Sequence, residues 1–331
     1  MALKTLFVAA LATVGIGLTL YLSSQESPSK TDVSGYLAHV RKYNKLMGSP
    51  QELEYRAKIF NDNMIFAGQV NKKQSSFVAG DNQLADLSFS EFSQNFLSKK
   101  TIAKEIKHLT SEPKLQGRKD WRAENKVTPV KNQGSCGSCW AFSAVATLEA
   151  AYAIKTGEFL SFSEQELVDC SGDYENEGCN GGMNTFALDY IVDNKIGLSK
   201  DYPYVARDQA CKIKPDKPRY GFKAKETINP IDVSGLIKGI EETPVSVAIE
   251  VQRDFQMYKG GVYTNNLCGE NLNHAVTAVG YVNEEGKDNQ YFIVKNSWGS
   301  GWGEEGFVRM AIGEGSGTCG IASDVDVIPK F

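Results

Sequence analysis

One cysteine in this chain stands where a thiol can act as a nucleophile. Cys139 follows a glycine- and serine-rich turn and opens an apolar, alanine-rich segment, 141–155, which is typical of a helix that stops at Gly157. At a helix N-terminus, unpaired N–H groups and the helix dipole favour negative charge. The thiolate is the reactive form of cysteine, so we expect this position to lower the pKa of the Cys139 thiol. Cys139 is therefore a candidate nucleophile.

A nucleophilic thiol needs a base that takes its proton and later returns it to the leaving group. The chain has three histidines, at positions 39, 108 and 274, and only His274 follows Cys139 in the sequence. His274 lies in a strand-like segment, where a single histidine is more often a structural core residue. The residues alone leave both roles open.

The wording of the cysteine segment is specific to a family. The run Cys136-Gly137-Ser138-Cys139-Trp140 resembles the signature of papain and the cathepsins. From about residue 35 to 331 the chain resembles a papain-like cysteine protease, most closely the cathepsin L-like branch. The resemblance implies an α+β, two-lobed fold, in which a helical lobe and a β-barrel-like lobe flank a cleft, with a helical inhibitory propeptide in front. It also implies a cysteine endopeptidase that works through a Cys–His pair and a thioester acyl-enzyme, without cofactor or metal.

The resemblance assigns the catalytic roles residue by residue. His274, 135 positions after Cys139, stands in the run Asn-His-Ala-Val that resembles the family's catalytic histidine segment. Asn296 resembles the asparagine that orients the imidazole ring, and Trp298 would shield that hydrogen bond from water. Gln133 and the backbone N–H of Cys139 resemble the family's oxyanion donors, which stabilise the charge that forms during peptide attack.

The resemblance also implies a set of substrate-binding residues. Glycines on one wall of the cleft would let an extended peptide approach the main chain. An aspartate at the floor of the S2 pocket could accept a basic P2 side chain, although a position turned toward solvent is an equal alternative. The implied substrate-binding residues are Gly181, Gly182, Met183, Ala248, Ala275 and Trp298, with Asp324 at the floor.

The cysteine count is odd. Seven cysteines all lie at or after residue 136, and an odd number in a secreted chain indicates pairs plus one free thiol. Six cysteines allow 15 pairings, among which the sequence alone does not choose. The pairing that the resemblance implies is Cys136–Cys179, Cys170–Cys211 and Cys268–Cys319, which leaves Cys139 free.

The N-terminal region predicts two segments in front of the peptidase. Residues 1–22 have Lys4 before an apolar run and are typical of a signal peptide, with an uncleaved signal anchor as the alternative. Residues 23–114 resemble a cathepsin L-like inhibitory propeptide, with a helix over 53–71 and the motif Gly80-x-Asn82-x-Leu84-x-Asp86. The lysine-rich segment 99–119 is typical of a linker that proteases cut. We expect the peptidase domain to cover 115–331.

Charge divides in the same way. Residues 1–117 carry 14 Lys and Arg against 10 Asp and Glu, a net of +4, whereas residues 118–331 carry 22 against 30, a net of −8. A basic front part and an acidic back part suggest mutual attraction, with two unrelated solvated surfaces as the alternative. The acidic body argues against nucleic-acid binding.

Periodicity predicts helices before strands in the peptidase part. The run Ser163-x-x-Glu166 predicts a capping box at a helix start, and 184–194 is an amphipathic helix. The β-rich segments that follow are 245–251, 274–282, 291–295 and 307–312. A helical half followed by a sheet half agrees with the two-lobed fold.

Three other classes of protein fit the sequence less well. The run Cys136-x-x-Cys139 is formally a redox motif, but no βαβ unit precedes it. A zinc site needs clustered ligands, whereas these cysteines are dispersed, and an inactive binding protein of this fold would lack the cysteine or the histidine, both of which are present. The chain shows no histidine-containing exopeptidase insert and no Asn-x-Ser/Thr sequon. We expect protein and peptide substrates, the chain's own propeptide and cystatin-like inhibitors as partners, a monomer, and a lysosome- or phagosome-like vacuole or secretion as destination.

Overall fold

The structure, a computed structural model, describes residues 33–46, 48–99, 116–226, 228, 232–265, 267–284, 290–323 and 328–330. The predicted signal peptide, most of the predicted linker and Asp324 lie outside these ranges. Within them, no helix combines the length and the apolar character needed to cross a bilayer.

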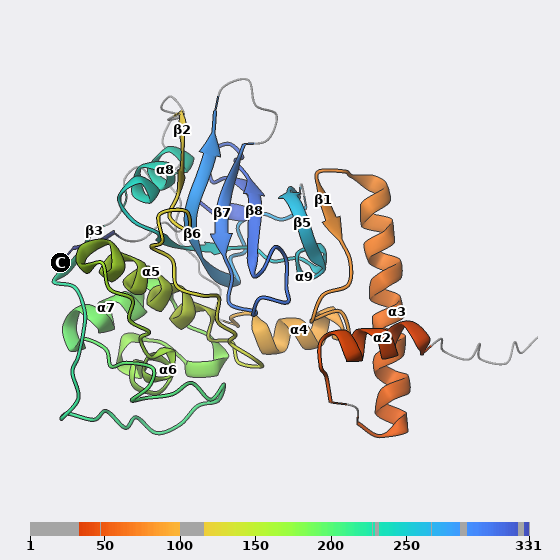
Figure 1. The fold of residues 1–331 in the computed structure, drawn as a ribbon, viewed down its shortest axis with the longest axis horizontal. Coiled ribbons are helices and arrows are strands. Elements are labelled where there is room, and N and C mark those ends of the chain that lie inside the picture. Colours follow the sequence, from red (N-terminus) through yellow and green to blue (C-terminus); the bar gives the residue numbers. More distant parts are fainter. Residues whose placement is uncertain are drawn as a thin grey trace, which may run out of the picture.

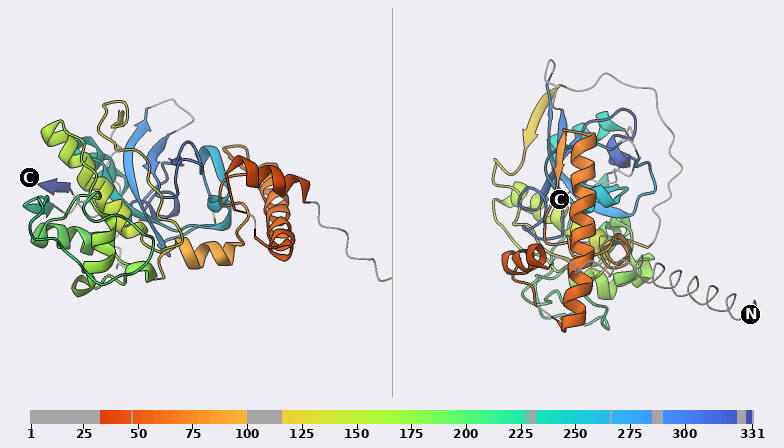
Figure 2. Two further views of the ribbon diagram at one scale, coloured as in Figure 1. Left: turned by 60° about the horizontal axis from the view of Figure 1, so that its bottom comes forward. Right: turned by 90° about the vertical axis from the view of Figure 1, so that its right-hand side faces the viewer.

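The N-terminal part of the described chain is helical, as the propeptide interpretation predicts. The predicted helix over 53–71 forms the middle of a longer helix, α3. This helix starts after Ser49, and the Ser49 side chain caps it by accepting a hydrogen bond from the Glu52 N–H at 3.2 Å. Figure 2 shows α2 and α3 at one end of the molecule. The elements of this part are α2 (Ser34–Lys42), α3 (Pro50–Lys73), β1 (Phe77–Ala79) and α4 (Phe89–Phe96).

A helical lobe follows, at the opposite end of the molecule (Figure 1). The predicted helix after Cys139 is present and ends at Gly157, whose φ of 79° is the left-handed conformation that glycine adopts without strain. The helix over 184–194 has the predicted bounds. The helices of this lobe are α5 (Cys139–Thr156), α6 (Glu164–Cys170) and α7 (Asn184–Asn194).

The capping box predicted at α6 is only half formed. Ser163 accepts a hydrogen bond from the Glu166 N–H at 3.0 Å. The Glu166 carboxylate does not return to Ser163, because it accepts from the Gly197 N–H at 2.9 Å and from Arg219 at 2.5 Å. The complete capping box lies instead at α4, between Ser88 and Glu91.

The sheet lobe contains the four predicted strand segments. Its main sheet has the order β1-β5-β8-β7-β6-β2, with β4 also paired to β6, and every pairing is antiparallel except β5 with β8. The strand β1 of the N-terminal part lies at one edge of this sheet, so it joins the propeptide to the body (Figure 1). The strands and helices of this lobe are β2 (Gly117–Asp120), α8 (Val233–Glu242), β4 (Val245–Ile249), α9 (Arg253–Gln256), β5 (Tyr258–Tyr263), β6 (His274–Asn283), β7 (Tyr291–Lys295) and β8 (Phe307–Ala311), and a separate pair is β3 (Ala224–Glu226) with β9 (Ile328–Lys330).

Two hydrophobic cores position the site. One lies in the sheet lobe and continues into the propeptide through residues such as Phe92, whereas the other surrounds α5 in the helical lobe. The cores meet where α5 faces β6. The structure contains the three disulfides Cys136–Cys179, Cys170–Cys211 and Cys268–Cys319, the pairing that the resemblance implied, and Cys139 is the free cysteine.

Candidate active site

Cys139, His274 and Asn296 meet between the two lobes. Cys139 is the first residue of α5, and His274 is the first residue of β6. Ala275, next to His274, packs in the same hydrophobic cluster as Cys139, so the helix start and the strand start lie side by side. Nε2 of His274 lies 2.8 Å from Oδ1 of Asn296, directly after β7.

The hydrogen bond to Asn296 decides which ring nitrogen is basic. With Oδ1 of Asn296 as the acceptor, Nε2 of His274 carries the ring proton, and Nδ1 is left as the basic nitrogen. Nδ1 is buried and has no hydrogen-bond partner among the described residues. The ring stacks on Trp298 with centroids 4.6 Å apart, and Trp298 is fully buried, so water is kept from the His274–Asn296 bond.

Burial controls the protonation of the pair in this form of the chain. It raises the pKa of the Cys139 thiol to about 11, although the backbone N–H groups of Ala275, Trp140, Ser98 and Cys139 itself act in the opposite direction. Burial also lowers the pKa of His274 to about 4, against the hydrogen bond to Asn296. The predicted lowering of the thiol pKa at the helix N-terminus is therefore wrong for this form, since desolvation outweighs the N–H groups. Thiol and imidazole are both neutral here at pH 7.

The side-chain amide of Gln133 is fixed with its N–H₂ group toward the cleft. Its Oε1 accepts from Ser297 Oγ at 2.6 Å, and its backbone N–H donates to the Ser297 carbonyl at 2.8 Å. Nε2 donates to the carbonyl of Cys136 at 2.8 Å and to the carbonyl of Phe96 at 2.9 Å. Phe96 belongs to α4, so a peptide carbonyl of the N-terminal part already occupies this donor.

The chain that follows α4 fills the cleft between the two walls. The Ser98 N–H donates to the Asn273 carbonyl at 2.8 Å, and the Lys99 N–H donates to the Asn180 carbonyl at 3.1 Å. Asn273 lies on the sheet side of the cleft and Asn180 on the helical side. A Cβ placed on Gly181, whose φ is 128°, would lie 2.3 Å from Ser98 Oγ. This close approach explains why only glycine fits there.

The other residues predicted to bind substrate lie in different surroundings. Met183 packs with Ala248 and with Leu272, which the sequence analysis did not identify. Ala275 pairs with Ala248 across β6 and β4 but packs in the core around α5. Gly182 faces inward, since a Cβ there would lie 2.8 Å from the Trp140 ring. Asp324 lies outside the described residues.

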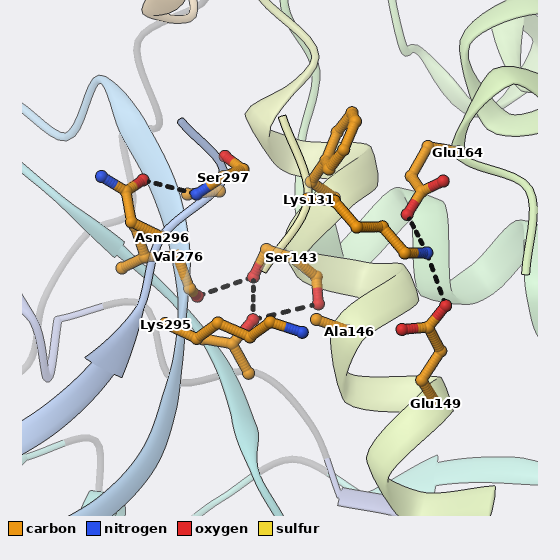
Figure 3. A pocket seen from close by; sticks show the side chains of 12 residues that line it. Lys131, Ser143, Ala146, Glu149, Glu164, Val276, Lys295, Asn296 and Ser297 are labelled. Carbon is orange, nitrogen blue, oxygen red and sulfur yellow. Dashed lines mark hydrogen bonds and ion pairs between the residues drawn. The ribbon is translucent and has the colours of Figure 1, made fainter. Parts of the chain in front are cut away.

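A buried charge cluster lines the same pocket as Asn296 and Ser297 (Figure 3). Lys131 lies 2.6 Å from both Glu149 and Glu164, and Lys295, the residue before Asn296, donates to Thr128 Oγ1 at 3.0 Å. Burial lowers the pKa of Lys295 to about 8. Thr128 Oγ1 in turn donates to the Glu149 carboxylate, so Thr128 and Lys131 together link α5 and α6 to β7 and join the two lobes at the back of the site. We call Lys131, Glu149, Glu164 and Lys295 the body cluster.

Several residues that shape the site were missed from the sequence. Ser297 stood inside a motif already in use, and its place next to Asn296 was the available signal. The carbonyl groups of Asn273 and Asn180 carry no side-chain signal at all. Leu272 lies two positions before His274 and is an apolar residue with no motif of its own.

Comparison with known proteins identifies the families that this architecture matches. Residues 115–328 match the family described as "Papain family cysteine protease", and residues 36–92 match the "Cathepsin propeptide inhibitor domain (I29)". Chymopapain of Carica papaya is 39% identical over 96% of this chain and 94% of its own length, and papain from the same plant is 37% identical over 96% and 95%. A digestive procathepsin L 3 of Tenebrio molitor has a structure with a TM-score of 0.78 at 32% identity, over 92% of this chain and 100% of that one.

These matches define a cysteine endopeptidase that is made as a zymogen with an inhibitory propeptide. The chain belongs to the papain family of cysteine proteases. The α+β, two-lobed fold with a propeptide domain, expected from the sequence, is confirmed by the solved zymogens.

Proposed function

We propose that Cys139 is the nucleophile of this endopeptidase and His274 its acid and base. Nδ1 of His274 takes the proton of the Cys139 thiol, and the thiolate adds to the scissile carbonyl carbon. The C–N bond breaks as His274 gives this proton to the leaving amine. Water then attacks the thioester while His274 takes a proton from it, the C–S bond breaks to release the acid, and the proton on His274 returns to the Cys139 sulfur. Asn296 orients the ring throughout, through its 2.8 Å hydrogen bond to Nε2.

Gln133 and the backbone N–H of Cys139 are the proposed oxyanion donors. The observation that carries the whole proposal is the 2.9 Å hydrogen bond from Gln133 Nε2 to the carbonyl of Phe96. The Gln133 amide, which Ser297 holds in one orientation, thus binds the peptide carbonyl of Phe96 near the free thiol of Cys139. Such preorganised donors are worth roughly 10²–10³-fold in rate each.

The catalytic roles are tested by substitution in the matured enzyme. Cys139→Ser and His274→Ala should each lower kcat on the order of 10⁶-fold, because the two residues act as a unit. Asn296→Ala should cost less, on the order of 10²-fold, since it removes only the orienting bond. Peptide hydrolysis is measured after active-site titration. If Cys139→Ser retains more than trace activity once wild-type contamination is excluded, the assignment is wrong.

Latency follows from the segment in the cleft. We propose that residues 23–114 form the propeptide and 115–331 the peptidase domain, and that cleavage falls between Ser111 and Lys119. The ranges matched to known families, 36–92 and 115–328, support this division. Removal of residues 96–99 from the cleft would expose Cys139 and His274 to water, and so relieve the desolvation that keeps both neutral. N-terminal sequencing of the active form checks the boundary; an active form that still starts near residue 25 contradicts it.

Specificity is proposed to reside in an apolar S2 pocket. Met183 and Ala248 lie in one apolar cluster, and with Ala275 they favour Leu, Val or Phe at P2. Asp324 at the floor would add a second mode, in which an ionised carboxylate binds Arg. The test compares kcat/KM for matched Leu-Arg and Arg-Arg dipeptidyl substrates in the wild type and in Asp324→Ala. An Arg/Leu ratio that stays constant in Asp324→Ala shows that this carboxylate points elsewhere.

Compartment and partners complete the proposal. Residues 1–22 are proposed as a signal peptide that sends the zymogen into the secretory pathway, to a lysosome- or phagosome-like vacuole or to the exterior. Three disulfides support an oxidising route. We propose a monomer that cleaves proteins and peptides and that cystatin-like inhibitors block in the cleft. Gel filtration, and titration of the mature enzyme with a cystatin, test these two points.

A further inference from the structure

The loop 133–138 carries one proposed oxyanion donor at its start and leads into the other. Gln133 opens the loop, and Cys139 follows Ser138. On its cleft side the loop is fixed by Ser297 and by the Cys136–Cys179 disulfide. Its other side faces the segment Tyr204–Asp208, in which no residue had a predicted role.

A single hydroxyl group joins the two ends of this loop. The Tyr204 hydroxyl donates to the Gln133 carbonyl at 2.7 Å and lies 2.7 Å from Ser138 Oγ. A tyrosine hydroxyl has one proton, so Ser138 is the donor in the second bond. The result is a continuous chain of hydrogen bonds from Ser138 through Tyr204 to Gln133.

The use of Ser138 differs from that of the other serines, and the aspartate, that precede α-helices among the described residues. The side chains of Ser49, Ser88, Ser163 and Asp232 each accept a hydrogen bond from the first turn of their helix. Ser138 stands at the same position before α5, yet its side chain makes no such bond. Its hydroxyl is committed to Tyr204 instead, and the N–H of Ala141 is satisfied by the Ser138 carbonyl at 2.9 Å.

Tyr204 is itself held from several directions. Its ring meets Phe142 of α5 edge-on, with centroids 4.8 Å apart and planes at 89°. The next residue, Val205, donates its N–H to Gln165 of α6 at 2.9 Å. At the far end of the segment, Asp208 accepts from the Cys179 N–H at 2.8 Å. The hydroxyl is therefore presented by a braced segment and not by a free loop.

We propose that Tyr204 is a positioning residue of the oxyanion hole, whose hydroxyl holds Gln133 and Ser138 at a fixed separation. The two oxyanion donors, the Gln133 amide and the N–H of Cys139 next to Ser138, then face one carbonyl oxygen. The inference rests on the proposed roles of Gln133 and Cys139. Tyr204 touches neither substrate nor reacting atoms, so its effect must pass through the loop.

The first test is Tyr204→Phe in the matured enzyme. It keeps the ring against Phe142 and removes only the hydroxyl. We expect kcat for peptide hydrolysis to fall about tenfold, a fraction of the loss of a whole donor, with KM within about twofold. Affinity for a peptide aldehyde, whose hemithioacetal oxygen occupies the oxyanion hole, should fall in parallel. Alkylation of Cys139 by iodoacetamide forms no oxyanion and should keep its rate.

The control is Tyr202→Phe, two residues earlier. The Tyr202 hydroxyl also has two partners, Asp169 at 2.8 Å and the Lys212 N–H at 3.1 Å, but neither belongs to the oxyanion loop. We expect its hydrolysis and alkylation rates to stay within about twofold of the wild type, because no oxyanion donor is moved. Equal losses in Tyr202→Phe and Tyr204→Phe would overturn the proposal, as would a parallel loss of hydrolysis and alkylation in Tyr204→Phe.

The second test is a double-mutant cycle with Ser138→Ala. Both substitutions break the same hydrogen-bonded chain, so the double variant should hydrolyse peptides no more slowly than Tyr204→Phe alone. Additive losses would overturn the chain, and Ser138→Ala supplies a readout if Tyr204→Phe fails to fold. Failure of the proposed function looks different, since the wild type itself would then lack hydrolysis or survive iodoacetamide.

Discussion

The propeptide and the body each bury a cluster of charged side chains, and the two clusters are built differently. In the body cluster, two lysines face two glutamates, and Lys131 lies 2.6 Å from both carboxylates. Burial lowers the pKa of Lys131, but Glu164 and Glu149 raise it further, so the net shift is upward. Lys131 therefore stays charged throughout the physiological range, whereas burial raises the pKa of Glu164.

The propeptide cluster has a histidine at its centre. His39 Nδ1 lies 2.6 Å from Asp81, and its Nε2 lies 3.8 Å from Asp86. Lys42 pairs with Asp81 at 2.8 Å, and Lys45 pairs with Asp86. The rings of Tyr36, Tyr43 and Phe60 surround His39, and Arg56 of α3 donates to the Asp86 carbonyl.

The difference concerns where a change of pH acts. Histidine is the side chain whose ordinary pKa lies nearest neutrality. Apart from His274, His39 is the sole histidine within the described residues. We infer that the lysines of the body cluster stay charged in mild acid and up to neutrality, whereas His39 of the propeptide cluster loses its charge as the pH rises above 6.5 through its raised pKa. Three substitutions test this contrast.

The largest effect is expected in the body cluster. Glu149→Gln removes a buried carboxylate and leaves Lys131 and Lys295 without half of their counter-charge. Breaking a buried ion pair in this way costs roughly 3–5 kcal/mol of the free energy of unfolding. Urea denaturation of the Cys139→Ser zymogen, which cannot digest itself, measures the loss. Glu158→Gln, an exposed site just after α5, is the control. A loss below about 1 kcal/mol would mean that the body cluster does not hold the lobes together.

The second effect concerns an uncharged anchor of the propeptide. Asn82 is buried, and its Nδ2 donates to the body carbonyls of Gln256 at 2.8 Å and Tyr258 at 3.2 Å. Asn82→Ala removes both hydrogen bonds, at a cost of about 1–3 kcal/mol, and the Gln256 carbonyl keeps the Trp302 Nε1–H as a donor at 3.2 Å. The propeptide should be released about tenfold faster, measured as the half-time of maturation. Because no titrating group is removed, this acceleration should be the same at every pH. A strongly pH-dependent acceleration would show that Asn82 is coupled to the charged cluster.

Local patterns predicted the elements of this fold, and contacts between distant segments explain what they missed. The end of α5 at Gly157 and the bounds of α7 follow from signals within a few residues, so the sequence was sufficient for them. The carboxylate of Glu166 was predicted to cap α6, but Arg219 and the Gly197 N–H, both distant in sequence, compete for it. Competition of this kind leaves no trace in a short motif.

The active site shows the same limit. A catalytic role for Cys139 and His274 could be proposed from the sequence, because it rests on residue type and spacing. The pKa of the thiol could not be predicted, since it depends on burial in the folded chain, where the distant segment 96–99 lies in the cleft. The role of Tyr204 could not be predicted either, because a tyrosine in the sequence does not indicate its hydrogen-bond partners. Only the structure places its hydroxyl between Gln133 and Ser138.

The smallest effect is the one that varies with pH, and its sign follows from the propeptide cluster. Burial lowers the pKa of His39, but the hydrogen bond to Asp81 and the nearby carboxylate of Asp86 raise it above the ordinary value of 6.5. This stabilisation is complete below pH 6.5 and is lost as the pH rises through the raised pKa. Burial raises the pKa of each aspartate, but His39 and the lysines lower it below 3.8. The stabilisation from the aspartates is present above pH 3.8 and is lost below it.

The propeptide cluster therefore stabilises most between about pH 4 and pH 6.5, so His39 should delay maturation in mild acid. His39→Gln should mature about tenfold faster than the wild type near pH 5.5, the value of one charged hydrogen bond, and this ratio should fall toward one as the pH rises through the raised pKa of His39. The ratio of maturation half-times at each pH cancels the pH dependence of the protease itself. Lys58→Gln removes a charge from the exposed face of α3 and controls for net charge. A ratio that does not change with pH, as expected for Asn82→Ala, would place the pH response outside the propeptide cluster and remove the contrast between the two regions.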